Sequence, residues 1–142
     1  MKISYNWLKE YINLKVNPQK LAEDLCLFGH EVEDITKIDN DYILDIKFTA
    51  NRGDCLSILG ISREIAALYN ISIKQKLIEV KENNLNKKIH INISIPEICP
   101  RFSARIIDNI EIKSSPQWVQ DKLTSYGFRT INNIVDITNL VM

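Results

Sequence analysis

Residues 44–69 place the strongest constraint on the fold, because strand, turn and helix patterns follow one another there without a gap. Apolar residues alternate with polar ones up to Phe48, which predicts a strand. Ala50-Asn51-Arg52-Gly53 then predicts a tight turn, and Asp54 is placed to cap the following helix with its carboxylate. The apolar stripe of this helix is formed by Ile58, Ile61, Ile65 and Leu68. The pattern predicts a strand–turn–helix unit and points to no function.

One glycine lies inside the predicted helix. Gly60 costs about 1 kcal/mol of helix propensity relative to alanine. We therefore expect another part of the backbone to approach it closely.

The composition describes a neutral chain with a limited core. Its 142 residues are 45% hydrophobic, enough for one modest core or two small ones. Eighteen basic residues offset eighteen acidic ones, so no long-range field attracts nucleic acid or membrane. No apolar run is long enough for a transmembrane helix, and the start lacks the apolar core of a signal peptide. The three cysteines lie far apart and predict reduced thiols in the cytosol, and with only two histidines we expect no metal site.

The first part of the chain carries clear signals for helix starts and ends. Ser4 can cap a first helix, and Asn17 followed by Pro18 marks the start of a second. Gly29 sits where a left-handed helix terminator belongs. The turn residues around Asn40 then predict a hairpin. The predicted core of this part consists of Trp7, Leu21, Leu25, Ile58, Ile61 and Ile65.

The second part predicts two strand regions and two helices. Residues 74–88 are polar and rich in asparagine and lysine, which indicates a boundary. Isoleucines alternate over 89–95, a pattern typical of a strand with one buried face, and a second strand region runs over 99–112. Ser115-Pro116 predicts the start of a helix that ends at Gly127, and Thr130 can cap a last helix. We expect Trp118, Val119, Leu123 and Tyr126 of the first helix, and Ile131, Ile134, Val135 and Val141 of the last, to face inward.

No catalytic site follows from the residues alone. A catalytic cluster could be drawn from Asn51, Arg52 and Asp54 on the turn beside Arg63 and Glu64. The structural interpretation is stronger, with Arg52 paired to a neighbouring acid. The chain has no phosphate-binding glycine loop and no nucleophile beside a base motif. Cys55 and Cys99 show no basic surroundings that would lower their pKa, so we expect inert buried thiols.

Several motifs together carry a resemblance to one family. They are Trp7-Leu8-Lys9-Glu10-Tyr11, Gly29-His30-Glu31-Val32-Glu33, the gapless run Thr49 to Glu64, Cys99-Pro100-Arg101-Phe102, Ser115-Pro116-Gln117-Trp118, Gly127-Phe128-Arg129-Thr130-Ile131 and Val135-Asp136-Ile137-Thr138-Asn139. In this order they resemble the beginning of the beta subunit of bacterial phenylalanyl-tRNA synthetase. The resemblance covers nearly the whole chain.

The resemblance implies an α+β fold in two parts. Residues 1–75 resemble the first beta-subunit domain, a small helical, winged-helix-like unit with a hairpin. Residues 76–87 would be a linker, and residues 88–142 resemble the opening strands and helices of the editing domain, here expected to be truncated at Met142. Most bacterial members carry an inserted oligonucleotide-binding barrel near residue 40, for which this chain has no room. Contact with tRNA through that barrel is therefore not implied.

The resemblance also implies a cytoplasmic role in protein biosynthesis. The family's enzyme joins phenylalanine to its tRNA with ATP and magnesium, at a site in the alpha subunit, and assembles as two alpha plus two beta subunits. No cofactor and no catalytic residue of that reaction is expected in this chain, which we expect to be inactive alone. The family's editing pocket, which removes mis-attached tyrosine, implies a role for Thr138 and Asn139.

Two other interpretations remain open at this point. On spacing alone, Thr138 bonds to a carbonyl one turn earlier and Asn139 caps the helix end. The whole chain can alternatively be a free-standing nucleic-acid-binding module of winged-helix-like type, although its lysines are dispersed rather than clustered.

Overall fold

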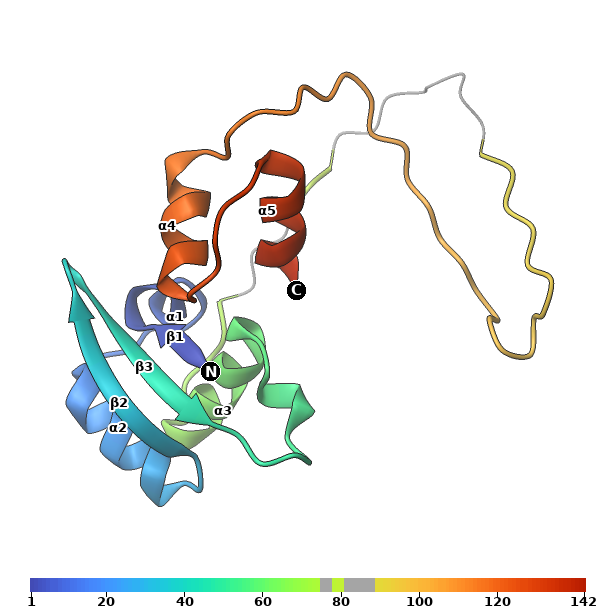
Figure 1. The fold of residues 1–142 in the computed structure, drawn as a ribbon. Helices are drawn as coiled ribbons and strands as arrows, with labels where there is room; N and C mark the ends of the chain where they lie inside the picture. The colour runs from blue at the N-terminus through green and yellow to red at the C-terminus, as the bar shows by residue number, and fades with distance from the viewer. Residues whose placement is uncertain (75–77, 81–88) are drawn as a thin grey trace. The chain divides into compact units, whose positions relative to one another are not determined.

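The computed structural model describes residues 1–74, 78–80 and 89–142. Its contacts divide the chain into two units, one formed by Met1–Lys76 with Ile112–Met142 and the other by Leu77–Glu111. All the helices and strands found in the described residues belong to the first unit (Figure 1). In order they are β1 (Lys2–Ser4), α1 (Tyr5–Tyr11), α2 (Pro18–Leu27), β2 (Glu31–Ile38), β3 (Asp41–Lys47), the 3₁₀ turn η1 (Gly53–Cys55), α3 (Ile58–Leu68), α4 (Gln117–Ser125) and α5 (Asn133–Val141). The α+β prediction is confirmed.

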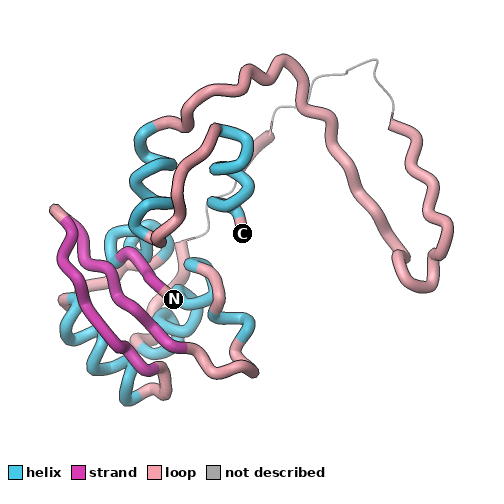
Figure 2. The backbone as a smooth tube through the Cα atoms, viewed as in Figure 1, coloured by secondary structure: helices cyan, strands magenta, loops and turns pink. Residues whose placement is uncertain are grey.

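The sheet of the first unit is antiparallel, with strand order β1-β3-β2. β2 and β3 form the predicted hairpin, in which Ile38 pairs with Asp41 across a two-residue turn (Figure 2). Asp39 takes a positive φ of 50°, a conformation that aspartate tolerates better than most residues. β1 adds the third strand on the other side of β3, with Ile3 opposite Leu44. The N-terminal strand is thereby fixed at one edge of the sheet.

The helix signals in the first part of the chain are confirmed. The Ser4 hydroxyl accepts the Trp7 amide hydrogen, and the Asn17 side chain accepts that of Lys20, with Pro18 as the first helical residue. Helix α2 ends at Gly29, which has φ 102°. The amide of Gly29 bonds to Cys26 O and that of His30 bonds to Leu25 O, closing the last turn.

The segment after β3 corrects one prediction. Asp54 does not cap α3, because the chain first forms η1 and the helix begins at Ile58 with Ser57 as its cap. The Ser57 hydroxyl accepts the Gly60 amide hydrogen at 3.0 Å. The predicted close approach at Gly60 is confirmed: a Cβ built there would overlap the carbonyl oxygen of Asp54.

The core lies between the sheet and helices α1, α2 and α3. All six residues predicted for this core belong to it. Helices α4 and α5 pack against the same core through Tyr126 and Leu140. The rings of Tyr126 and Trp7 form a T-shaped pair with a centroid distance of 5.2 Å, and Lys122 pairs with Glu10 at 2.8 Å. None of the helices in the described residues could cross a membrane.

Two predicted caps in the C-terminal part are wrong. Asn132, not Thr130, caps α5 by accepting the amide hydrogens of Ile134 and Val135. Ser115 does not cap α4, since its hydroxyl donates to Asp136 instead. Gly127, with φ 86°, ends α4 as predicted.

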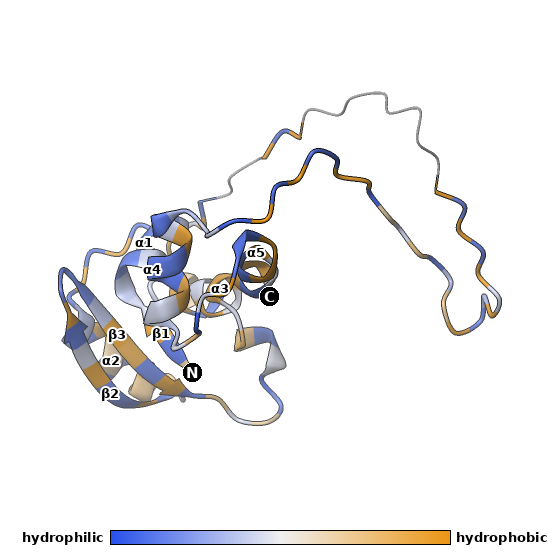
Figure 3. Ribbon diagram, turned by 45° about the horizontal axis from the view of Figure 1, so that its top comes forward, coloured by the Kyte–Doolittle hydropathy of each residue, from blue (hydrophilic) through white to orange (hydrophobic). Residues whose placement is uncertain are grey.

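The predicted inner faces of α4 and α5 are only partly correct. On α4, Val119 and Leu123 are buried but Trp118 is 57% exposed. The four residues expected to face inward from the last helix are all exposed, and one of them, Ile131, lies before α5. Figure 3 shows the apolar character of this helix. The reason is that α5 turns Asp136 and Leu140 towards the rest of the unit, and the four predicted residues lie outside that contact surface.

The strands predicted over 89–95 and 99–112 are absent from the described residues, so this prediction is wrong. The segment 89–111 is extended and turns once, where the Cys99 amide bonds to Ile95 O at 3.0 Å. An alternating pattern supplies a face for burial, but a strand also needs a hydrogen-bonded neighbour, and the described residues provide none. The grouping of Ile112–Met142 with the first unit also differs from a boundary at 76–87. This grouping is based on contacts within this chain alone. The division into a first domain, a linker over 76–87 and an editing domain therefore stays a prediction.

Candidate functional site

The residues predicted for an editing pocket are neighbours on α5. Thr138 is exposed, and its hydroxyl donates to Ile134 O at 2.9 Å. The predicted bond to a carbonyl one turn earlier is therefore confirmed. Asn139 is half-buried and lies inside the helix, which ends at Val141, so the prediction that it caps the helix end is wrong.

The start of α5 is tied to the loop that precedes α4. The carboxylate of Asp136, 1% exposed, accepts hydrogen bonds from the Ser115 hydroxyl at 2.5 Å and from the Ile131 amide at 2.8 Å. Asn133 and Lys113 exchange two further bonds, from Asn133 N to Lys113 O at 2.8 Å and from Lys113 N to Asn133 Oδ1 at 3.2 Å. These contacts fix the direction in which α5 presents Thr138 and Asn139.

Exposed apolar residues surround the two polar ones. Ile134 is 43% exposed and Ile137 49%, one turn and one residue before Thr138. A threonine hydroxyl that donates to the backbone still has lone pairs free to accept, and an asparagine amide both donates and accepts. This part of α5 can therefore offer an apolar surface together with hydrogen-bonding groups to a small ligand.

A second polar cluster surrounds Arg52. Its guanidinium bonds to both carboxylate oxygens of Asp54, at 3.1 and 3.0 Å, and to Glu64 Oε1 at 2.7 Å. These contacts confirm that Arg52 pairs with neighbouring acids. The Arg52 guanidinium lowers the pKa of Asp54 to about 2, and the two carboxylates raise the pKa of Arg52 above its ordinary value.

Cys55 lies against this cluster. Arg52 Nη2 is 3.1 Å from its Sγ, so the expectation of no basic neighbour is wrong. Burial nevertheless outweighs the guanidinium, with a contribution from the hydrogen bond to Asp54, and raises the pKa of the thiol to about 11. Its predicted inertness as a nucleophile fits this environment.

His30 also belongs to this cluster. Its place there was not predicted from the sequence. The residue is 3% exposed, with its ring standing edge-on to Phe48 at 5.4 Å. Its Nε2 atom lies 3.6 Å from Glu64 Oε2 and has no hydrogen-bond partner. A signal existed: His30 directly follows the terminator Gly29, and the second residue after a helix end commonly packs back on the helix.

Comparison with known proteins adds two findings. Residues 98–142 match the model of the B3/4 domain family. The whole chain is 37% identical to the phenylalanine–tRNA ligase beta subunit of Rhodopirellula baltica and 40% identical to the chloroplastic subunit of Porphyra purpurea, covering 21% of each. For the Fusobacterium nucleatum subunit, 42% identity extends over 72% of the chain and 13% of that protein.

These alignments also bear on the barrel missing near residue 40. The Rhodopirellula alignment extends over 144 residues and the Porphyra alignment over 149, against 142 in this chain. Neither relative therefore carries a domain-sized insertion within the aligned stretch. The direct connection between β2 and β3 is shared by these relatives.

Proposed function

Because this chain belongs to the family of phenylalanine–tRNA ligase beta subunits, and spans 21% of the length of the first relatives, we propose that it works as one part of such a ligase. The observation that carries the proposal is the 37% identity over the whole chain, together with the B3/4 match over 98–142. The ligase attaches phenylalanine to its tRNA, in the cytoplasm, with an alpha subunit as the partner.

In this proposal the first unit is a scaffold. Four helices of the described part cap their own first turns, through Ser4, Asn17, Ser57 and Asn132. Each cap thereby uses one or two of the amide hydrogens that could otherwise bind a phosphate group at that helix start. The described residues do not fit ATP with Mg²⁺, which we assign to the partner subunit of the intact enzyme.

The stretch around α5 contributes to editing. Thr138 and Asn139 help to hold the mis-attached aminoacyl end of the tRNA while water hydrolyses the ester. Tyrosine differs from phenylalanine by one hydroxyl, and a site that hydrogen-bonds this hydroxyl discriminates strongly between the two. The exposed apolar residues beside Thr138 suit the aromatic ring, and the polar side chains suit its substituents.

The test uses the full two-subunit enzyme with Thr138→Val and Asn139→Ala. We expect hydrolysis of tyrosyl-tRNA to fall at least tenfold, about 1.4 kcal/mol per factor of ten, while charging with phenylalanine stays within twofold. Thr124→Val, an exposed threonine on α4, is the control. Hydrolysis at the wild-type rate in both variants would leave Thr138 and Asn139 with a structural role only.

A gel shift separates this proposal from a free-standing nucleic-acid-binding module. The purified chain should bind neither tRNA nor duplex DNA with the steep salt dependence that many phosphate contacts produce. Binding of duplex DNA that weakens strongly between 50 and 200 mM salt would support the module instead.

A further inference from the structure

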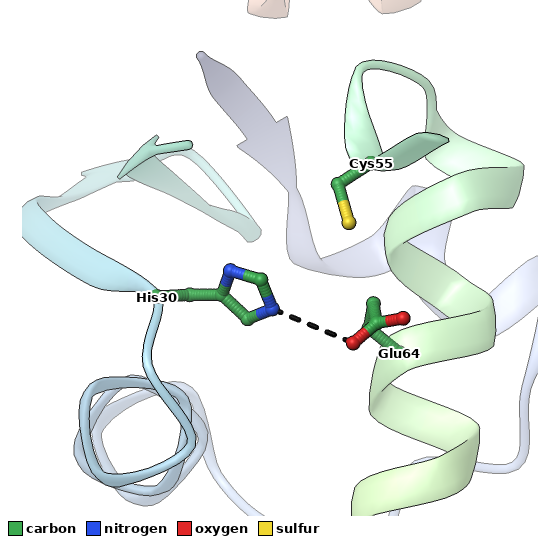
Figure 4. Close-up of side chains that lie close together, drawn as sticks. All are labelled: His30, Cys55 and Glu64. Atoms are coloured by element: carbon green, nitrogen blue, oxygen red, sulfur yellow. Dashed lines mark ion pairs between the residues drawn. The ribbon is translucent and has the colours of Figure 1, made fainter. Parts of the chain in front are cut away.

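We propose that His30 Nε2, Cys55 Sγ and Glu64 Oε2 bind a divalent transition-metal ion such as Zn²⁺. The three side chains come from different elements: His30 from the link between α2 and β2, Cys55 from η1 and Glu64 from α3 (Figure 4). Each offers one donor atom, and the three donors lie within 4.8 Å of one another.

The spacing is close to that of a metal site. Zinc bonds to sulfur at about 2.3 Å and to nitrogen or oxygen at about 2.0–2.2 Å, so tetrahedral ligands lie about 3.3–3.7 Å apart. His30 Nε2 and Glu64 Oε2 are already 3.6 Å apart. Only Cys55 has to approach, and its Sγ points into the space between the other two (Figure 4).

Two of the three donor residues are buried. His30 is 3% exposed and Cys55 fully buried. The Nε2 atom of His30 faces Glu64 without a hydrogen-bond partner, although buried polar atoms are normally paired. A cation at the centre of the three donors supplies the partner that Nε2 lacks.

Arg52 supports the site instead of blocking it. It bonds to Glu64 Oε1, which leaves Oε2 free for the cation and fixes the carboxylate. It also approaches Cys55 Sγ, as a donor to a metal-bound thiolate would. Its own charge is offset by Asp54. A dication with one thiolate, one carboxylate and one neutral imidazole then leaves no net charge in the cluster.

The donor set also selects the metal. Thiolate and imidazole favour zinc and its neighbours over magnesium or calcium, which prefer oxygen ligands. On binding, the metal–sulfur bond forms as the S–H bond of Cys55 breaks, and the proton leaves to solvent. Because the ligands come from three elements, the bound cation would join η1 and α3 to the start of the hairpin.

Cobalt(II) is the probe for the experiment, because a thiolate ligand gives it a strong near-ultraviolet charge-transfer band. We expect the band of the purified chain, without a histidine tag, to grow until one equivalent of cobalt has been added. The band should disappear when zinc is added. Cys55→Ser should abolish the band, and His30→Gln or Glu64→Gln should weaken cobalt binding at least tenfold. Circular dichroism reports whether each variant is folded.

A double variant makes the result independent of how Cys55→Ser folds. Cys26→Ser with Cys99→Ser leaves Cys55 as the one cysteine of the chain, and Cys26 is exposed and Cys99 half-buried. A band of full intensity in this variant assigns the thiolate to Cys55. Absence of the band in the wild-type protein or in the double variant, with cobalt in excess, would overturn the proposal.

Discussion

The Ser115 hydroxyl donates a 2.5 Å hydrogen bond to Asp136, a carboxylate that is 1% exposed and lies 21 residues later in the chain. The same carboxylate accepts the Ile131 amide hydrogen. One buried acid therefore joins the loop before α4 to the beginning of α5. The position of Thr138, half a turn further along α5, depends on this junction.

Asp136→Ala should destabilise the first unit by about 2–3 kcal/mol, because it leaves a buried hydroxyl and a backbone amide without their acceptor. Urea unfolding monitored by tryptophan fluorescence measures the effect. Asp121→Ala removes an exposed acid from α4 and should change stability by less than about 0.5 kcal/mol. Equal stability of the two variants would contradict the role of Asp136.

Gly60→Ala should also destabilise the chain. Alanine gains about 1 kcal/mol of helix propensity, but its methyl group would overlap the carbonyl oxygen of Asp54, which is backbone and cannot turn aside. Overpacking of this kind costs about 1–3 kcal/mol, and we expect a net loss of about 1–2 kcal/mol.

Gly53→Ala is the matched control for Gly60, because a Cβ on Gly53 meets nothing within 4 Å. The free energy of unfolding of Gly53→Ala should lie within about 0.5 kcal/mol of the wild-type value. A stabilised Gly60→Ala variant would mean that η1 moves away from α3 at little cost.

Acid should weaken the contact between Asp24 on α2 and Tyr69, the residue that follows α3. Bonds from Lys20 and from the Tyr69 hydroxyl lower the pKa of Asp24. A group with a lowered pKa in the folded state stabilises the protein above its unfolded pKa, about 4, and loses this contribution as the pH falls through the folded value.

Asp24→Asn should therefore reduce the acid sensitivity of stability below about pH 4, the range in which the wild-type carboxylate takes up its proton. Unfolding by urea at pH 5, 4 and 3 gives the comparison. Glu23→Gln, an exposed change one residue earlier, should retain the wild-type dependence. If the free energy of unfolding fell equally with pH in the wild type and in Asp24→Asn, Asp24 would not be the source of the acid sensitivity.

The parts of the fold that could be predicted depend on neighbours in sequence. The helix starts at Ser4 and Asn17 and the helix end at Gly29 depend on bonds between residues three to five positions apart, so the local sequence was sufficient to predict them. The cap of α3 was predicted wrongly because two residues that can cap a helix, Asp54 and Ser57, lie three residues apart. Only the intervening 3₁₀ turn decides between them.

The candidate sites depend on neighbours in space. Glu64 meets His30 across 34 positions of the chain, and no spacing rule anticipates a ligand set drawn from a helix end, a turn and a helix. The apolar face of α5 was misjudged for a related reason. Periodicity shows that Ile134 and Ile137 share a surface region, but not whether another element covers them.

Residues 89–111 should exchange their amide hydrogens far faster than β3 and α3. In the described part of this segment the backbone forms few internal bonds, whereas β3 is paired on both sides and α3 lies in the core. Exchange from well-packed elements needs large-scale unfolding, while exposed backbone exchanges from the native state. We also expect protection to return from Val119 onward, because α4 packs on Trp7 through Tyr126.

Hydrogen exchange followed by mass spectrometry on peptic peptides measures this profile. The peptides covering β3, α3 and α4 should remain protected after peptides from 89–111 have exchanged completely. Asp136→Ala serves as the internal test, since by destabilising the first unit it should speed exchange in β3 and α3 as well as in α4 and α5, and leave the exposed segment 89–111 unchanged. Protection over 89–111 equal to that of α3 would show that these isoleucines pair as strands in solution, as their alternation predicts.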